Sequence, residues 1–175
     1  MTAALLQLAP DMRGCFAATP ALAALAAGAH WSLECQFFDN AVALAERVHA
    51  AARSAASAHL LATALVRRGD LLSALVVLQP WIEGTLDAAA ASAAADDDTP
   101  SQILACRYLY ARTCLGVNKM AEGEAVMART LAEVGGKLSA ADESAILALL
   151  GGLCQYAHGS GQERRAPARP PQCAS

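Results

Sequence analysis

Residues able to perform acid–base, nucleophilic or metal chemistry are scarce in this sequence, and they form no known catalytic motif. The four histidines have no cysteine or carboxylate at a motif spacing, and they are His30, His49, His59 and His158. The sequence also lacks a glycine-rich dinucleotide loop, a Walker loop and a His-Glu-x-x-His helix. We therefore expect a protein that is not an enzyme, with no cofactor and no small-molecule substrate.

The cysteines are best interpreted as reduced thiols, four of them within helical patterns that have apolar neighbours. The six are Cys15, Cys35, Cys106, Cys114, Cys154 and Cys173. Cys106 and Cys114 are eight residues apart, which is not a spacing typical of zinc ligands. The sequence therefore predicts no structural metal site.

Composition predicts an all-α protein. Of the 175 residues, 44 are alanine, 5% are aromatic and 17% are charged, and the formal net charge is −3. Alanine has the highest helix propensity, and so few β-branched and aromatic residues disfavour a sheet. The apolar content excludes disorder of the whole chain, and a pI near 5.8 disfavours nucleic-acid binding. No apolar run is long enough for a membrane span, and the first residues lack the basic start of a signal peptide, so we expect an intracellular protein.

The order of helix and turn signals divides the chain into a preamble, a helical domain and a tail. We expect a preamble over residues 1–20, a helical domain over 21–157 and a basic, proline-rich, disordered tail over 159–175, with Arg164, Arg165 and Arg169 solvated. The low-complexity sequence of residues 86–100 predicts a solvated insert within the domain. The expected helix pairs are 22–37 with 41–53, 57–68 with 71–83 and 101–117 with 120–134, followed by a single helix over 141–157. A tight turn is expected at Phe38–Asn40, with Asp39 or Asn40 capping the helix that follows.

Helix pairs recur at a fixed period. Ala41 and Ala74 are 33 residues apart, and Ala74 and Gly123 are 34 apart once the fifteen residues of the insert are removed. A period near 34 with two helices per unit is typical of tetratricopeptide repeats. The pattern therefore predicts a superhelix of antiparallel helix pairs, with about three and a half repeats. An irregular alanine-rich bundle is the alternative.

Projection of this repeat onto helices predicts two sets of residues. Small residues are expected where helices cross closely, namely Ala29, Ala41, Ala62, Ala74, Ala111, Gly123 and Gly151. First-helix residues expected to line a concave groove are His30, Glu34, His59, Thr63, Arg67, Tyr108 and Arg112. Mixed charge with aromatic area is typical of a peptide-binding groove, and ordinary solvated surface is the equal alternative.

Three segments resemble one family: Ala41–Ala50, His59–Leu78 and Ala105–Met127. They are similar to the N-terminal tetratricopeptide region of the third subunit of the anaphase-promoting complex, a multi-subunit ubiquitin ligase. The resemblance extends from about Trp31 to Tyr156, and its most specific part is CRYLYARTCLGVNKMAEGE, which spans Cys106–Glu124. The family's long linker and its later repeats have no counterpart here, so its coactivator-binding role is not carried over.

This resemblance implies a non-catalytic scaffold of the nucleus and cytoplasm that acts in mitotic cell-cycle progression. Its partners would be a second copy of itself and other subunits of the ligase. Apolar residues expected to support the homodimer are Leu22, Leu25, Leu33, Phe37, Val42, Leu44, Tyr108, Leu109 and Met127. The alternative is a stand-alone adaptor of the cochaperone type that grips an acidic peptide. Only Arg67, Arg107 and Arg112 could form the required clamp, which disfavours the adaptor.

Overall fold

The computed structural model describes residues 19–83, 100–134 and 140–163, and these residues form α-helices with no strand among them. The helices are α1 (Pro20–Glu34), α2 (Phe38–Ala52), α3 (Ala55–Arg68), α4 (Leu71–Glu83), α6 (Pro100–Gly116), α7 (Met120–Val134) and α8 (Ala140–Glu163). The predicted all-α class is confirmed, and the arrangement is that of a tetratricopeptide-like superhelix.

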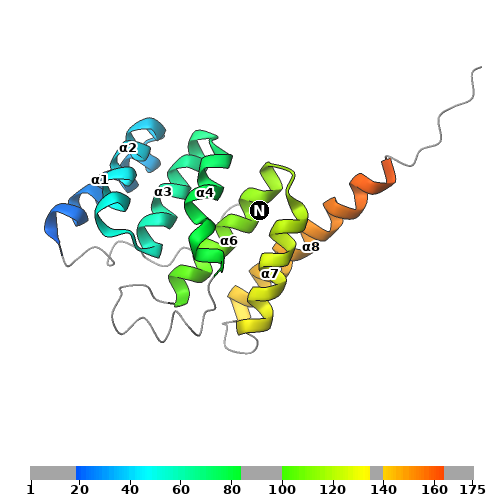
Figure 1. Ribbon diagram of the computed structural model, residues 1–175. Coiled ribbons are helices and arrows are strands. Elements are labelled where there is room, and N and C mark those ends of the chain that lie inside the picture. The colour runs from blue at the N-terminus through cyan, green and yellow to red at the C-terminus, as the bar shows by residue number, and fades with distance from the viewer. Residues whose placement is uncertain (1–18, 84–99, 135–139, 164–175) are drawn as a thin grey trace, which may run out of the picture.

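The helices stand in a row, each packed mainly against its neighbours in sequence (Figure 1). The pairs α1–α2, α3–α4 and α6–α7 form the repeats, and α8 packs on α7. The first helices also contact one another along the row, in the order α1, α3, α6 and α8. Contacts between equivalent helices of successive pairs are what repeat stacking requires, because each repeat touches only its neighbours.

Local sequence explains where α3 and α4 begin. Ser54 and Ser57 form a reciprocal capping box, in which the Ser54 hydroxyl accepts from the Ser57 amide and the Ser57 hydroxyl accepts from the Ser54 amide. Gly69 ends α3 in the left-handed region at φ 94°, where glycine has no side-chain penalty. Asp70 then accepts from the Ser73 amide and starts α4. These capping residues were therefore enough to predict the end of α3 and the start of α4 from the sequence.

The first turn lies three residues earlier than the sequence pattern predicted, so the expected turn at Phe38–Asn40 is wrong. The chain reverses over Cys35–Phe37, where Gln36 has a φ of 63°. The Phe37 carbonyl accepts from the Ala41 amide, which places Asp39 and Asn40 inside α2 rather than at its cap. The Asn40 side-chain amide instead donates to the Ser32 hydroxyl at 2.8 Å and ties α2 to α1. A glutamine in the left-handed region is rare, so the sequence contained no usual signal for this turn.

Each of the two expected irregular segments includes residues that the structure places in a helix. Pro100 is the first residue of α6, a position that suits proline because its missing amide needs no partner there. At the other end, α8 continues to Glu163, so residues 159–163 are helical rather than part of the tail. Glycines in this stretch cost about 1 kcal/mol each and do not by themselves end a helix. The rest of both segments, residues 86–99 and 164–175, lies outside the described residues.

Close helix crossings determine how the repeats pack. Gly123 of α7 lies so near its neighbours that an added Cβ would be 3.1 Å from the Ala111 carbonyl oxygen, the Cys114 Cβ and the Leu153 Cδ2. These three atoms belong to α6 and α8, so α7 is held tightly between two first helices.

Among the described helices, none is long and apolar enough to cross a bilayer.

Candidate interaction surfaces

The residues predicted to line a groove come from α1, α3 and α6, the first helices of their pairs. His30 and His59 face each other closely enough for His30 to act electrostatically on His59. Thr63 lies one turn after His59 and donates its hydroxyl to the His59 carbonyl at 2.7 Å. The two histidines and the threonine are all half-buried. The structure therefore brings the central part of the predicted groove together.

His59 is uncharged at neutral pH. Burial and, to a smaller extent, the nearby His30 together lower its pKa to about 4. An uncharged His59 ring is a poor contact for an acidic peptide, because it supplies no positive charge. The surface at His59 is therefore suited to neutral or apolar contacts.

The remaining groove candidates do not form one continuous charged surface. Glu34 and Arg112 are exposed, whereas Tyr108 is buried, and burial raises the pKa of the Tyr108 hydroxyl. The Arg67 guanidinium lies 5.8 Å from the centre of the Phe38 ring, so it packs on α2. Tyr108 is corrected from a groove residue to a core residue, because α6 is covered by helices on several sides.

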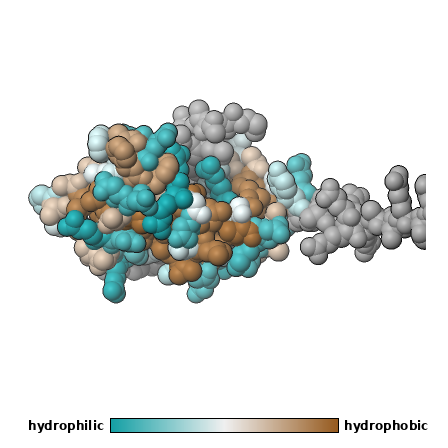
Figure 2. All heavy atoms as spheres, turned by 90° about the horizontal axis from the view of Figure 1, so that it is seen from above, coloured by the Kyte–Doolittle hydropathy of each residue, from teal (hydrophilic) through white to brown (hydrophobic). Residues whose placement is uncertain are grey.

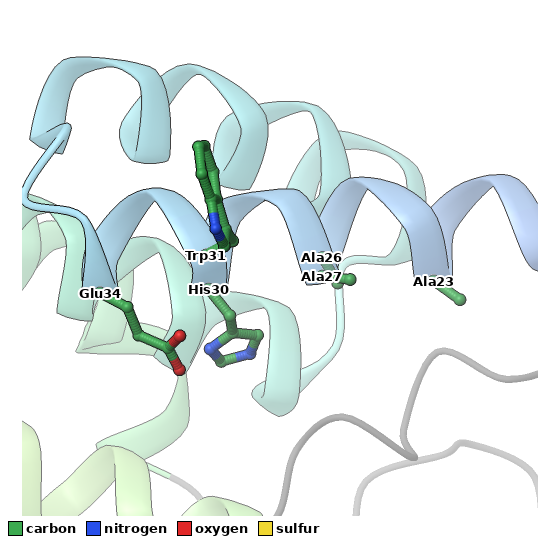
Figure 3. Close-up of a pocket in the computed structure, with 6 residues that line it drawn as sticks. All are labelled: Ala23, Ala26, Ala27, His30, Trp31 and Glu34. Atoms are coloured by element: carbon green, nitrogen blue, oxygen red, sulfur yellow. The ribbon is translucent and has the colours of Figure 1, made fainter.

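A shallow hollow lies along one side of α1 (Figure 3). Its volume is about 220 Å³, and it is lined by Ala23, Ala26, Ala27, His30, Trp31 and Glu34. His30 and Glu34 leave the helix on the same side, whereas the Trp31 ring points the other way. Pockets for small organic ligands are usually about 300–1,000 Å³, so this hollow fits a side chain better than a cofactor.

The corner between α1 and α2 displays two exposed aromatic rings. Trp31 is 59% exposed and Phe37 is 57% exposed, and their ring centres are 6.2 Å apart. We call this pair the aromatic corner. Trp31 was not predicted as a surface site, because nothing in the sequence pattern distinguishes an exposed tryptophan from a buried one. Apolar and polar side chains alternate over the face shown in Figure 2.

A second exposed apolar pair lies on α4. Leu72 and Val76 are one helical turn apart and are 64% and 73% exposed. Neither residue was predicted as a surface site. Exposed rings and aliphatic side chains of this size are typical of residues that bind other proteins.

Most of the predicted self-association residues are not on the surface. Val42, Tyr108, Leu109 and Met127 are buried within the chain, so they are corrected to core residues. Leu22, Leu25, Leu33 and Leu44 are half-buried against the core, and Phe37 is exposed. Helices of a repeat array contact neighbours on more than one side, so periodicity alone did not distinguish the free face from the packed ones.

The predicted crossing residues fall into two groups. Ala29, Ala41, Ala62, Ala74, Ala111 and Gly123 are buried. Gly151 is exposed, and nothing lies within 4 Å of where its Cβ would be. Gly151 is therefore not at a helix crossing among the described residues.

A buried ionic contact joins α6 to α7. Arg107 is fully buried, its Nη1 is 2.7 Å from the Glu133 Oε2, and it also donates to the Thr130 hydroxyl. Arg129 donates to the Ile82 carbonyl and so ties α7 to the end of α4. Because the sequence pattern offered Arg107 as a clamp residue for an acidic peptide, its burial removes one of the three candidates.

The described residues hold no cluster of three or more His, Cys, Asp or Glu side chains that could bind a metal ion. Two thiols are buried, and burial raises the pKa of Cys114 to about 11, so it remains protonated at neutral pH. Cys106 donates to the Ala55 carbonyl at 3.3 Å. These thiols have a structural environment rather than a nucleophilic one.

Comparison with known proteins gives one family match. Residues 34–95 match the family model described as "Anaphase-promoting complex, cyclosome, subunit 3". The matched part includes α2, α3 and α4 and covers 62 of the 175 residues. A search of curated proteins finds no match to this chain. The chain thus contains a tetratricopeptide region similar to that of this subunit family, which is a repeat scaffold type.

Proposed function

We propose that this protein is a non-catalytic scaffold subunit, or a fragment of one, of the anaphase-promoting complex, acting in mitotic progression in the nucleus and cytoplasm. The observation that supports this most directly is the family match over residues 34–95, within a row of tetratricopeptide-like helix pairs. Its partners are other subunits of the ligase and a second copy of the chain.

Homodimerisation is assigned to the first repeat. The aromatic corner offers two large exposed rings close together, and aromatic side chains are enriched among residues that dominate binding energy. Half-buried Leu33 of α1 adds apolar area in the same repeat. In a two-fold symmetric dimer, the aromatic corner of one copy would pack against the aromatic corner of the other.

The alternative of a stand-alone adaptor for acidic peptides has less support. Arg107 is buried against Glu133, Arg67 packs on Phe38, and the central groove histidine His59 is uncharged. Of the three predicted clamp cations, Arg67 and Arg112 are exposed, on different first helices, and Arg107 is buried. A carboxylate clamp needs several cations in one place, which these positions do not provide.

Affinity purification of the tagged full chain from its own cells tests the subunit assignment. We expect other subunits of the anaphase-promoting complex to be enriched and identified by mass spectrometry. Val76→Ser, on α4 and away from the aromatic corner, serves as a matched surface control against the paired change Trp31→Ser with Phe37→Ser. Recovery of the chain without any subunit of this complex would contradict the proposal.

A further inference from the structure

Three histidines lie at one boundary of the repeat array, between the first repeat, formed by α1 and α2, and the helix α3. His30 of α1 faces His59 of α3, and His49 of α2 lies against the start of α3. All three residues are half-buried. We call this boundary the histidine seam and define it by these three residues. No other histidine side chain is among those that the structure describes.

His49 is bound to the capping box of α3. Its Nδ1 is 2.9 Å from the Ser57 hydroxyl oxygen, which donates its own proton to the Ser54 carbonyl at 2.8 Å. His49 must therefore donate from a protonated Nδ1, and this hydrogen bond is kept when the ring becomes positively charged. Burial and, to a smaller extent, Arg53 lower the pKa of His49, so this position disfavours the charged ring.

His59 has no acidic partner among the described residues that act on it. The electrostatic neighbour that helps burial to lower its pKa is His30, which is another base. Glu34 leaves α1 on the same side as His30 (Figure 3), but it is not among the groups that act on His59. A positive charge on His59 is therefore uncompensated as long as the seam is closed.

The other charged groups packed around α3 are engaged elsewhere. On α4, the residues from Leu71 to Leu78 include no titratable side chain. On α6, Arg107 is paired with Glu133 of α7, and Arg112 acts on the buried Tyr108. These helices therefore leave the protonation of His59 to the seam itself.

Two arginines of α3 also cross the seam. The Arg67 guanidinium packs on the Phe38 ring, and Arg68 Nη1 lies 3.9 Å from the Asp39 carboxylate, both on α2. Neither contact involves a histidine. They hold the first repeat to α3 without responding to the protonation of an imidazole.

The next boundary of the array, where α6 packs on α3, is held by different groups. There the Cys106 thiol donates to the Ala55 carbonyl at 3.3 Å. The Tyr110 hydroxyl of α6 contacts Gln79 of α4 and Glu122 of α7. No described histidine side chain lies at this boundary. Mild acid is therefore expected to act on the histidine seam and not on the later helices.

We propose that the histidine seam is an acid-sensitive joint, at which mild acid makes the first repeat open away from α3 as a unit while the later helices stay packed. The helices α1 and α2 stay together, because they pack closely on each other and the Asn40 side-chain amide donates to the Ser32 hydroxyl. An end repeat can open without unfolding the rest, since each repeat contacts only its neighbours.

Proton uptake determines the size of the effect. In the open state His59 is in water and has its ordinary pKa of 6.5, whereas in the closed state its pKa is about 4. The advantage of the closed state is complete above pH 6.5 and is lost as the pH falls toward 4. Between pH 7 and pH 5, His59 alone should raise the opening equilibrium constant about twentyfold. His49, whose pKa is also lowered, adds to this in the same direction.

Hydrogen–deuterium exchange of the purified full chain at pH 7 and pH 5, followed by mass spectrometry, tests the proposal. Each exchange rate is divided by the intrinsic rate at that pH, so that only the opening equilibria are compared. We expect the amides of α1 and α2 to exchange at least about twentyfold faster at pH 5 on this scale. The amides of α6 and α7 should change by less than about twofold.

Two variants test whether the seam is the cause. His59→Gln removes the titrating ring and should lower the ratio of the pH 5 rate to the pH 7 rate about twentyfold in α1 and α2. His158→Gln removes a histidine from α8 instead and should leave this ratio unchanged. The regional pattern in the parent chain decides the question even if His59→Gln does not fold.

An equal acid effect in all helices would overturn the proposal, because it would show unfolding of the whole domain rather than opening of the first repeat. An acid effect below about threefold in α1 and α2 would also overturn it, since linkage to His59 requires more. An undiminished effect in the double variant His49→Gln with His59→Gln would exclude the seam histidines as its source.

Discussion

At the scale of single residues, two buried polar groups make the structure sensitive to substitution. His59 of α3 lies where two repeats meet, and Arg107 of α6 lies between the two helices of its own repeat. Burial holds His59 uncharged at neutral pH, whereas Arg107 forms an ion pair with Glu133. These different surroundings lead to different predictions.

His59 should make the protein less stable in mild acid. Its pKa falls from 6.5 in the unfolded chain to about 4 in the folded protein, so between these pH values the unfolded state binds more protons. The contribution of His59 to the free energy of unfolding has its full value above pH 6.5. It is lost as the pH falls toward 4, and the loss is at most about 3 kcal/mol. Urea unfolding across this range should show a shallower pH dependence in His59→Gln. Parallel curves for the two proteins would contradict this assignment.

Arg107→Ala should lower the free energy of unfolding by about 3–5 kcal/mol, because it leaves Glu133 partly buried without its cation. The double change Arg107→Met with Glu133→Met should recover most of this loss, since well-packed apolar residues replace a buried ion pair at little cost. Urea denaturation of the three proteins measures both effects. A double variant no more stable than Arg107→Ala would rule out the ion pair as the cause.

At the scale of helices, two glycines that were both predicted to lie at helix crossings have opposite surroundings. Gly123 is enclosed by backbone and side-chain atoms at 3.1 Å from an added Cβ, whereas Gly151 has open space. The enclosed glycine is needed for close approach, and the open one only lowers helix propensity.

Gly123→Val should therefore destabilise the protein by about 1–3 kcal/mol through overpacking. Gly151→Ala should stabilise it by about 0.5–1 kcal/mol through helix propensity. Thermal unfolding followed by circular dichroism compares both variants with the parent chain. A stabilising Gly123→Val would show that α6, α7 and α8 are not packed as described.

Sequence reasoning predicted the elements better than it predicted the surfaces. The helices and most of their ends followed from alanine content, from caps such as Ser54 and from Gly69, all of which act locally. The early turn at Gln36 was missed, because it depends on a left-handed residue that carries no sequence signal. Val42 and Met127 were placed on the surface because apolar residues on a repeat helix can face either of two neighbours.

The aromatic corner was only half predicted. Phe37 was named as a self-association residue, whereas Trp31 was not named, and both are exposed. Exposure of both rings depends on where α1 ends and how the chain turns into α2, which is a tertiary property. His30 and His59 were both predicted to line the groove from successive first helices, but their closeness to each other was not predicted.

At the scale of the whole molecule, a repeat array stays open at its ends and offers apolar surface there. The first repeat exposes the aromatic corner, and the last helix exposes Leu147 beside Gly151. We propose that the aromatic corner binds a second copy of the chain.

Self-association through the first repeat is tested most directly by sedimentation equilibrium of the purified chain at micromolar concentration. We predict a dimer of about twice the 18.0 kDa chain mass, and a monomer for the double variant Trp31→Ser with Phe37→Ser. The matched double variant Leu72→Ser with Val76→Ser, which removes equally exposed apolar residues from α4, should remain a dimer. A soluble 18.0 kDa monomer at every concentration of the parent chain would contradict the dimer and the scaffold role built on it.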